Sequence, residues 1–133
     1  MASDWLRRDQ ERIVILDSNA VMMLFEFSID LEDELIRLLG SFKIVVPKSI
    51  FDEIKFLSET GKGKKRFIAK PALELIKKYE VVDAEGTGDQ SVLNLAKKLN
   101  CIVVTNDRKL RNELKKASLH TIYLRGKSRL VLE

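Results

Sequence analysis

The chain has very little of the residues on which several common chemistries depend. It contains one cysteine, Cys101, and one histidine, His120, among its 133 residues. A lone thiol cannot form an internal disulfide, and Cys101 opens the apolar run CIVVT, so we expect it to be buried as a small hydrophobe. His120 lies near none of the acidic motifs described below, and we expect it to be structural. A phosphate-binding glycine loop, a GxSxG motif and paired cysteines are also missing, which disfavours P-loop NTPases, serine hydrolases and zinc sites.

Long apolar runs are missing as well. The sequence has no apolar stretch of 18 residues, and residues 1–11 lack the apolar centre of a signal peptide. We therefore expect a soluble protein of the reducing cytoplasm, without a membrane segment. At this length a single domain over residues 1–133 is the simplest interpretation. Within it we expect residues 1–11 to be an N-terminal extension and residues 125–133 to be a basic C-terminal tail.

Positive charge is unevenly distributed, although the net charge is only +4. Between positions 62 and 70 there are basic residues and no acidic ones: Lys62, Lys64, Lys65, Arg66 and Lys70. A second basic stretch begins at Arg108. Charge runs of this kind are more often a solvated surface than a binding site. Beside clustered carboxylates, however, positive charge is what attracts a polyanion to a site that also holds a cation.

Short runs rich in valine and isoleucine alternate with longer helical patterns. The expected strands are residues 13–16, 42–46, 79–82, 102–104 and 121–124, and this alternation is typical of an α/β fold with a parallel sheet between two layers of helices. Helices are expected over residues 31–39, 49–59, 67–78, 87–100 and 108–117. Asp30 and Asp107 are predicted to cap two of them, and Thr87 with Gln90 has the spacing of a capping box. Residues 60–65 are expected to form a mobile loop.

The segment from Ala20 to Phe27 is apolar nearly all round. A short helix of that composition is either fully enclosed by its own chain or covered by a partner. We favour the second interpretation, in which residues 20–27 mediate a homodimer.

Four acidic residues lie at or beside the ends of the expected strands: Asp17, Glu53, Asp89 and Asp107. Each also has a purely structural interpretation, because Asp17 can stabilise a turn, Asp89 and Asp107 begin helices, and Glu53 can reach solvent from the edge of a buried helix face. Taken together they map to one edge of one parallel sheet, where such folds bind ligands. Four carboxylates held close repel one another unless cations compensate, and a site of oxygen ligands alone suits Mg²⁺ or Mn²⁺.

The ordered motifs ILDSNA, VPKSIFDEI, GTGDQSVLNLAKKLN and IVVTNDRKLR resemble those of a PIN domain over residues 12–124. The resemblance implies a three-layer fold with strand order 3-2-1-4-5 and Mg²⁺- or Mn²⁺-dependent cleavage of single-stranded RNA. It carries over Asp17, Glu53, Asp89 and Asp107 as the catalytic and metal-binding set. It also implies supporting roles for Asn19 and Thr105. Some PIN domains have two adjacent acids where this chain has Asp89 and Gln90, so a fifth acidic ligand is missing here and it is open whether one ion binds or two.

Within that family, the basic loop and the ending YLRGKSRL look more like archaeal relatives of ribosomal-RNA processing factors than like VapC toxins. The residues expected to guide RNA phosphates are Lys62, Lys64, Lys65, Arg66 and Arg108. An antitoxin-like or ribosomal partner is possible under these interpretations. A non-catalytic RNA-binding or assembly module stays open as an alternative, whereas a phosphoacceptor receiver is disfavoured because the residues at its key positions, Asp17, Asp83 and Arg125, fit poorly.

Overall fold

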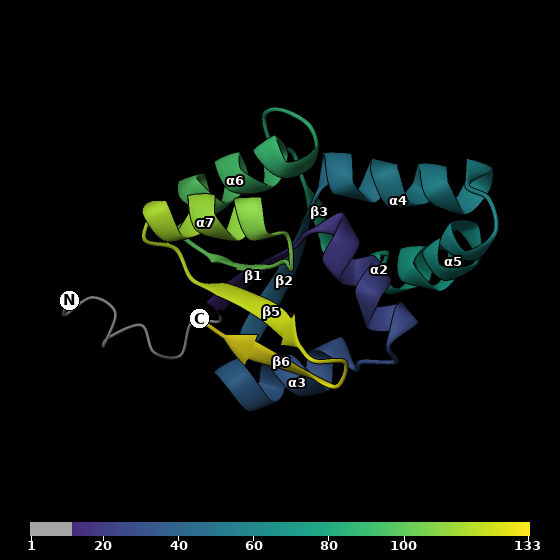
Figure 1. The fold of residues 1–133 in the computed structure, drawn as a ribbon. Helices are drawn as coiled ribbons and strands as arrows, with labels where there is room; N and C mark the ends of the chain where they lie inside the picture. Colours follow the sequence, from purple (N-terminus) through teal and green to yellow (C-terminus); the bar gives the residue numbers. More distant parts are fainter. Residues whose placement is uncertain (1–11) are drawn as a thin grey trace.

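The computed structural model describes residues 12–133 and shows one mainly parallel sheet. Its strands, in chain order, are β1 (Arg12–Leu16), β2 (Phe42–Pro47), β3 (Glu80–Val82), β4 (Ile102–Val104), β5 (Thr121–Arg125) and β6 (Arg129–Leu132). They lie in the order β3-β2-β1-β4-β5-β6, and only β6 runs antiparallel, to β5 (Figure 1). The predicted parallel order 3-2-1-4-5 is therefore confirmed.

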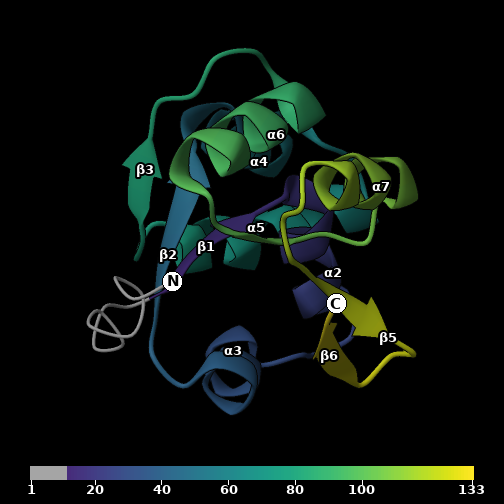
Figure 2. The same ribbon diagram turned by 90° about the vertical axis from the view of Figure 1, so that its left-hand side faces the viewer.

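Helices cover both faces of this sheet, as expected for the three-layer arrangement. They are α2 (Ser18–Glu26), α3 (Leu31–Leu39), α4 (Lys48–Thr60), α5 (Lys64–Ile76), α6 (Gly88–Leu99) and α7 (Arg108–Lys116). Figure 2 shows α6 and α7 on one side of the strands and α3 on the other. The helices α2, α4 and α5 pack together beyond the carboxyl ends of β1 and β2. No helix of residues 12–133 is long and apolar enough to cross a membrane.

The central strands form the core because their side chains are buried on both faces. Val14, Ile15 and Leu16 of β1 are completely buried, as are Val103 of β4 and Ile122 of β5. Strands enclosed on both sides show continuous apolar runs rather than alternation, which explains the pattern in the sequence. Cys101 is buried beside them, as predicted, and burial raises the pKa of its thiol to about 12.

The expected basic tail is wrong from Arg125 onward. Arg125 is the last residue of β5, residues 126–128 form a turn, and Arg129–Leu132 return as strand β6 along β5. Leu130 fills the core side of this strand, while the basic residues lie in the turn and at its exposed edge. The strand is difficult to predict because it is short, lies between charged residues and has a single buried leucine.

The loop after α4 is shorter than predicted. It spans residues 61–63, and α5 begins at Lys64 rather than Phe67. Gly61 lies so close to the chain that a Cβ atom there would collide with the carbonyl oxygen of Leu57, and Gly63 adopts a φ of +59° that favours glycine. The longer helix places Pro71 in its interior rather than near its start.

The predicted helix caps are only partly present. Asp30 and Asp107 accept hydrogen bonds from the backbone N–H groups of Asp33 and Leu110, as expected. Thr87 does precede α6, but its side chain forms no capping bond, and the Gln90 amide donates to Asn94 instead. The predicted capping box is therefore wrong.

Candidate functional site

Asp17 directly follows β1 and is almost fully buried, with 2% of its surface exposed. Its backbone N–H donates to the carbonyl of Val104 at the end of β4, so the two strand ends are held side by side. Thr105 follows β4 and donates a 2.8 Å hydrogen bond from its hydroxyl to Oδ2 of Asp17. The predicted support of Asp17 by Thr105 has a direct contact in the structure.

The electrostatic state of Asp17 is unusual for a carboxyl group. Burial raises its pKa to about 6, the hydrogen bond from Thr105 partly opposes this, and the negative charges of Asp89 and Asp107 raise the pKa further. No lysine or arginine among residues 12–133 forms an ion pair with it. A buried carboxylate without a cationic partner is costly, and binding a cation would relieve that cost.

Asp89 and Asp107 belong to the same charge group. Asp89 lies exposed in the first turn of α6, and partial burial, followed by repulsion from Asp107, raises its pKa. Asp107 caps α7, and its backbone N–H donates a 3.1 Å hydrogen bond to Thr105. Asp107 therefore has the structural role considered for it and also repels Asp17 and Asp89.

Glu53 is more exposed than its predicted place at the edge of a buried helix face suggests. It projects from α4, and its Oε2 accepts a 3.1 Å hydrogen bond from the Ser18 hydroxyl. Its neighbour Asp52 pairs with Lys48 at 3.0 Å on the solvent side. Glu53 is thus connected to the acidic group through Ser18, the residue after Asp17.

Ser18 was not singled out from the sequence, although it stands between two residues that were. It is buried, whereas Asn19 is exposed and forms no side-chain hydrogen bond within residues 12–133. The only local signal for Ser18 is its place directly after Asp17, at the start of α2. The supporting role expected of Asn19 stays a prediction.

The donor chemistry of this acidic group fits a hard divalent cation, because every side chain in it offers oxygen. The group is not a closed coordination site, however: within the described part of the chain, no three Asp, Glu, His or Cys side chains are placed so that they could hold a metal ion. Repulsion from Asp89 and Asp107 raises the pKa of Asp17, repulsion from Asp107 raises that of Asp89, and a hydrogen bond joins Ser18 to Glu53.

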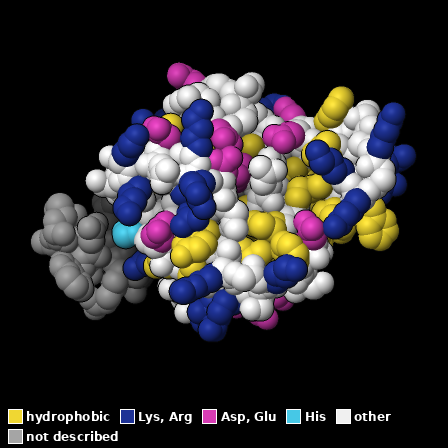
Figure 3. All heavy atoms as spheres, in the orientation of Figure 1, with side chains coloured by type: hydrophobic (Ala, Val, Ile, Leu, Met, Phe, Trp, Pro, Cys, Tyr) yellow, Lys and Arg dark blue, Asp and Glu magenta, His cyan; other side chains and the backbone are white. Residues whose placement is uncertain are grey.

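The basic residues expected to guide a polyanion lie on two sides of the acids. Figure 3 shows acidic side chains gathered between α7 and α4, with basic side chains over α7 and over the α4–α5 end. Lys62, Lys65 and Arg66 are exposed and, in the chain from residue 12 onward, form no ion pair, whereas Lys64 pairs with Glu26 at 3.1 Å. Arg108, also exposed, begins α7 next to Asp107.

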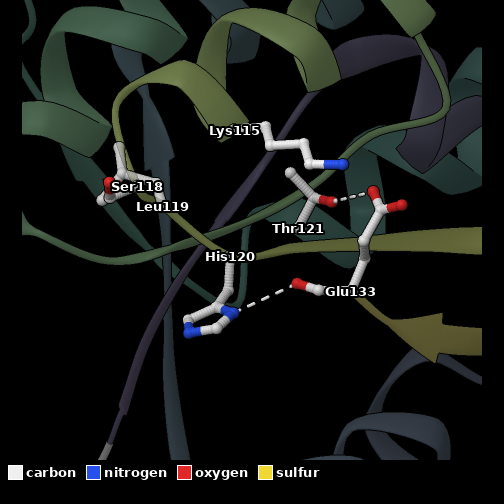
Figure 4. A pocket seen from close by; sticks show the side chains of 6 residues that line it. All are labelled: Lys115, Ser118, Leu119, His120, Thr121 and Glu133. Atoms are coloured by element: carbon white, nitrogen blue, oxygen red, sulfur yellow. Dashed lines mark hydrogen bonds between the residues drawn. The ribbon is translucent and has the colours of Figure 1, made fainter.

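A pocket of about 240 Å³ lies away from these acids, at the start of β5 (Figure 4). Its lining includes His120, whose Nδ1 is 3.1 Å from the backbone carbonyl oxygen of Glu133, and Thr121, whose hydroxyl donates to the Glu133 carboxylate. None of the four predicted acids lines this pocket. The contact of His120 with the end of β6 agrees with the structural role expected for it.

A parallel sheet in the order 3-2-1-4-5, with carboxylates at the ends of β1 and β4, defines a class of α/β domains that bind ligands at that edge. The model of the PIN-like domain family matches residues 14–127, and the chain belongs to this family.

Two relatives and one solved structure illustrate the similarity. The chain is 30% identical to Ribonuclease VapC9 of Archaeoglobus fulgidus, over 100% of this chain and 98% of that protein. It is 33% identical to Ribonuclease VapC4 of Methanocaldococcus jannaschii, over 86% of this chain and 91% of that protein. The structure of the PIN domain endonuclease Utp24 superposes with a TM-score of 0.74 at 20% identity, covering 91% of this chain and 90% of that one. This last likeness supports the fold.

Proposed function

We propose that the protein is a metal-dependent endoribonuclease that cleaves phosphodiester bonds of single-stranded RNA. Membership of the PIN-like family and the two relatives named as ribonucleases support a nuclease that acts on RNA. The observation that carries the proposal is Asp17, a buried carboxylate at the end of β1 that has no cationic partner and is repelled by two further acids.

In this proposal Asp17, Glu53, Asp89 and Asp107 hold one or two Mg²⁺ or Mn²⁺ ions. Such an ion, when bound, lowers the pKa of a water molecule and stabilises negative charge on phosphate oxygens. Thr105 orients Asp17 through its hydroxyl, and Ser18 positions Glu53 beside the end of β1. The carboxylates must draw closer than they stand in order to share an ion. Asp89 and Glu53 are exposed and are the members of the group with room to do so.

The basic residues supply affinity for the RNA strand rather than sequence readout. Arg108 is an exposed cation next to Asp107, and Lys62, Lys65 and Arg66 are exposed cations at the α4–α5 end; cations of this kind contact phosphates. Lys64 belongs to the same set, although its ammonium group also pairs with Glu26. Binding should therefore weaken as the salt concentration rises.

The proposal is tested by cleavage of an end-labelled, unstructured RNA with Mn²⁺, Mg²⁺ or a chelator. The wild type should cut with a divalent cation, and Asp17→Asn should cut at least about a hundred-fold more slowly, since the first ligand of the cation is lost. Asp52→Asn is the matched control, because Asp52 is next to Glu53 but pairs with Lys48 on the solvent side. Equal activity of the wild type and Asp17→Asn would remove Asp17 from the reaction.

Two biological settings remain compatible with this activity. The names of the two relatives favour a VapC-type toxin that is held by an antitoxin-like partner. Processing of ribosomal RNA by a cytoplasmic enzyme is the other setting, and it rests on the sequence resemblance. Cleavage of purified ribosomal RNA at one position, against cleavage of many unstructured RNAs, separates the two. A protein that binds RNA but does not cut it with either cation would instead be a binding module.

Dimerisation through residues 20–27 also remains part of the proposal. Ala20, Val21 and Leu24 are buried within the chain, whereas Met22, Met23 and Phe25 are only partly covered. Sedimentation of the wild type and of a Met22→Glu variant tests whether the partly covered side chains meet a second copy.

A further inference from the structure

Phe67 is the most exposed large apolar side chain of the described residues, with 79% of its surface accessible. It lies near the start of α5, on the side of that helix that faces solvent. Single exposed apolar residues are common on protein surfaces, so exposure alone indicates no function. The surroundings of the ring decide whether it has one.

The charged neighbours of Phe67 along α5 are basic. Lys64 lies one helical turn before Phe67 and Lys70 one turn after it, while Arg66 is adjacent. In the part of the chain that the structure describes, Arg66 and Lys70 form no ion pair. The first turn of α5 has three cations and no acid, an arrangement that the helix dipole disfavours. Helix stability therefore does not explain this composition.

The position of α5 connects Phe67 with the acidic group. Lys64 pairs with Glu26 at the end of α2, and α2 begins at Ser18, next to Asp17. A nine-residue helix is about 13 Å long, so Glu26 is about that far from Asp17, and the start of α5 lies beyond it by the reach of the Lys64–Glu26 ion pair. Figure 1 shows α2 running from the sheet edge to α5. An RNA strand bound at Asp17 would reach Phe67 within a few nucleotides.

We propose that the solvent face of α5 binds the single-stranded RNA substrate, with one base stacked on Phe67 and phosphates held by Arg66 and Lys70. This inference rests on the proposed function and names a part of its RNA-binding surface. Aromatic rings among cations are how proteins bind single strands without reading their sequence, because every base has a face that can stack. RNA, rather than an apolar partner, fits this surface because it complements both the ring and the positive charge.

The test measures RNA affinity in an Asp17→Asn background, so that the strand is not cut. A fluorescently labelled, unstructured oligoribonucleotide is titrated at fixed salt, and its anisotropy gives the dissociation constant. Phe67→Ala should raise this constant about five- to a hundred-fold, the range for loss of one stacked base, while Phe67→Trp should restore or improve affinity. Alanine is a good helix former, and circular dichroism checks that α5 is kept.

The chain offers a matched control in Phe56, which is also exposed, at 63%, but projects from α4, where acids lie one turn to either side. Asp52 lies one turn before it and Glu59 one turn after it. Phe56→Ala removes the same kind of exposed ring without touching the basic face, and we expect the dissociation constant to stay unchanged. Equal losses for Phe56→Ala and Phe67→Ala would overturn the inference.

A strand of the same length that has abasic sites keeps the phosphates but removes the bases. If Phe67 stacks on a base, the protein with Phe67 intact and the Phe67→Ala variant should bind the abasic strand with equal affinity. If Phe67→Ala also lowers the affinity for the abasic strand, the inference is overturned. It is likewise overturned if the protein with Phe67 is a dimer, Phe67→Ala is a monomer and the affinity for RNA is unchanged. If the protein with Phe67 intact binds no RNA at all, the proposed function itself fails.

Discussion

The hydroxyl of Thr105 donates a 2.8 Å hydrogen bond to Oδ2 of Asp17 and accepts a 3.1 Å bond from the backbone N–H of Asp107. One fully buried side chain thus connects the end of β1, the end of β4 and the start of α7. Two of the four predicted acids depend on it for their position. These hydrogen bonds hold the sheet edge together without a substrate or a cation.

Thr105→Val should weaken both the site and the fold. Valine has nearly the same shape but leaves a buried carboxylate oxygen without its donor, and we expect a loss of about 1–3 kcal/mol in the free energy of unfolding. RNA cleavage should fall about ten- to a hundred-fold, because an oriented ligand loses its support. Thr105→Ser keeps the hydroxyl and is the control. If valine and serine have equal effects in denaturation and cleavage assays, lost packing rather than the hydrogen bond is responsible.

Asp17 should make the cation-free protein less stable at neutral pH than in mild acid. Its pKa is about 6 in the folded chain against 3.8 for an ordinary aspartate, so the folded state binds the extra proton. This contribution to stability is lost as the pH rises from 3.8 to 6, and above pH 6 the cost is about 3 kcal/mol. In chelator at pH 7, Asp17→Asn should therefore melt at a higher temperature than the wild type.

The difference between the two proteins must also depend on pH. At pH 4 the carboxyl group is neutral in the folded chain, so the melting temperatures of wild type and Asp17→Asn should converge. A constant difference between pH 4 and pH 7 would show that burial of the charge is not its cause. Added Mn²⁺ should stabilise the wild type and not the variant, since only the former keeps the carboxylate.

Ser18→Ala should reduce activity more than Asn19→Ala does. Ser18 donates to Glu53, while Asn19 is exposed and has no side-chain hydrogen bond within residues 12–133. Removing the hydroxyl frees Glu53 to rotate, and a supporting contact of this kind is worth about ten-fold or more in metal affinity. Calorimetric titration with Mn²⁺ measures the effect directly. A larger loss for Asn19→Ala would return the supporting role to the residue that the sequence resemblance indicated.

Local patterns predicted the strands, the parallel sheet and the acids near the strand ends, whereas the strand order 3-2-1-4-5 came from the resemblance to a PIN domain. Runs such as residues 13–16 are apolar throughout, and an acid directly after such a run must lie at the sheet edge. Local patterns also predicted the Asp30 and Asp107 caps, since capping acts over three residues. These features need no knowledge of distant neighbours.

The features that the sequence did not predict depend on contacts between different elements of the chain. Strand β6 exists because β5 offers it an edge, which a four-residue run between charged residues does not reveal. The contact of Ser18 with Glu53 joins residues that are 35 positions apart in the chain. Each of these is a tertiary contact that overrides or supplements the local preference.

The last prediction concerns the way α3 holds strand β6. Oε1 of Glu34 accepts a 2.7 Å hydrogen bond from the backbone N–H of Leu130, and Arg37 donates a 2.6 Å bond to the carbonyl oxygen of the same residue. Glu34 and Arg37 also pair with each other at 2.9 Å. The two side chains together satisfy the outer backbone groups of an edge strand, which would otherwise be free to pair with another chain.

Glu34→Ala should therefore raise the rate of amide hydrogen exchange at residues 129–132 and lower the free energy of unfolding by about 1 kcal/mol or more. Glu74→Ala is the matched control, because Glu74 forms an ion pair of the same spacing and length, 2.9 Å, with Lys77 but no hydrogen bond to a strand of the described residues. Exchange in β6 should be unchanged in that variant, since an exposed pair contributes little. Equal exchange in both variants would show that packing of Leu130 alone holds β6 in place.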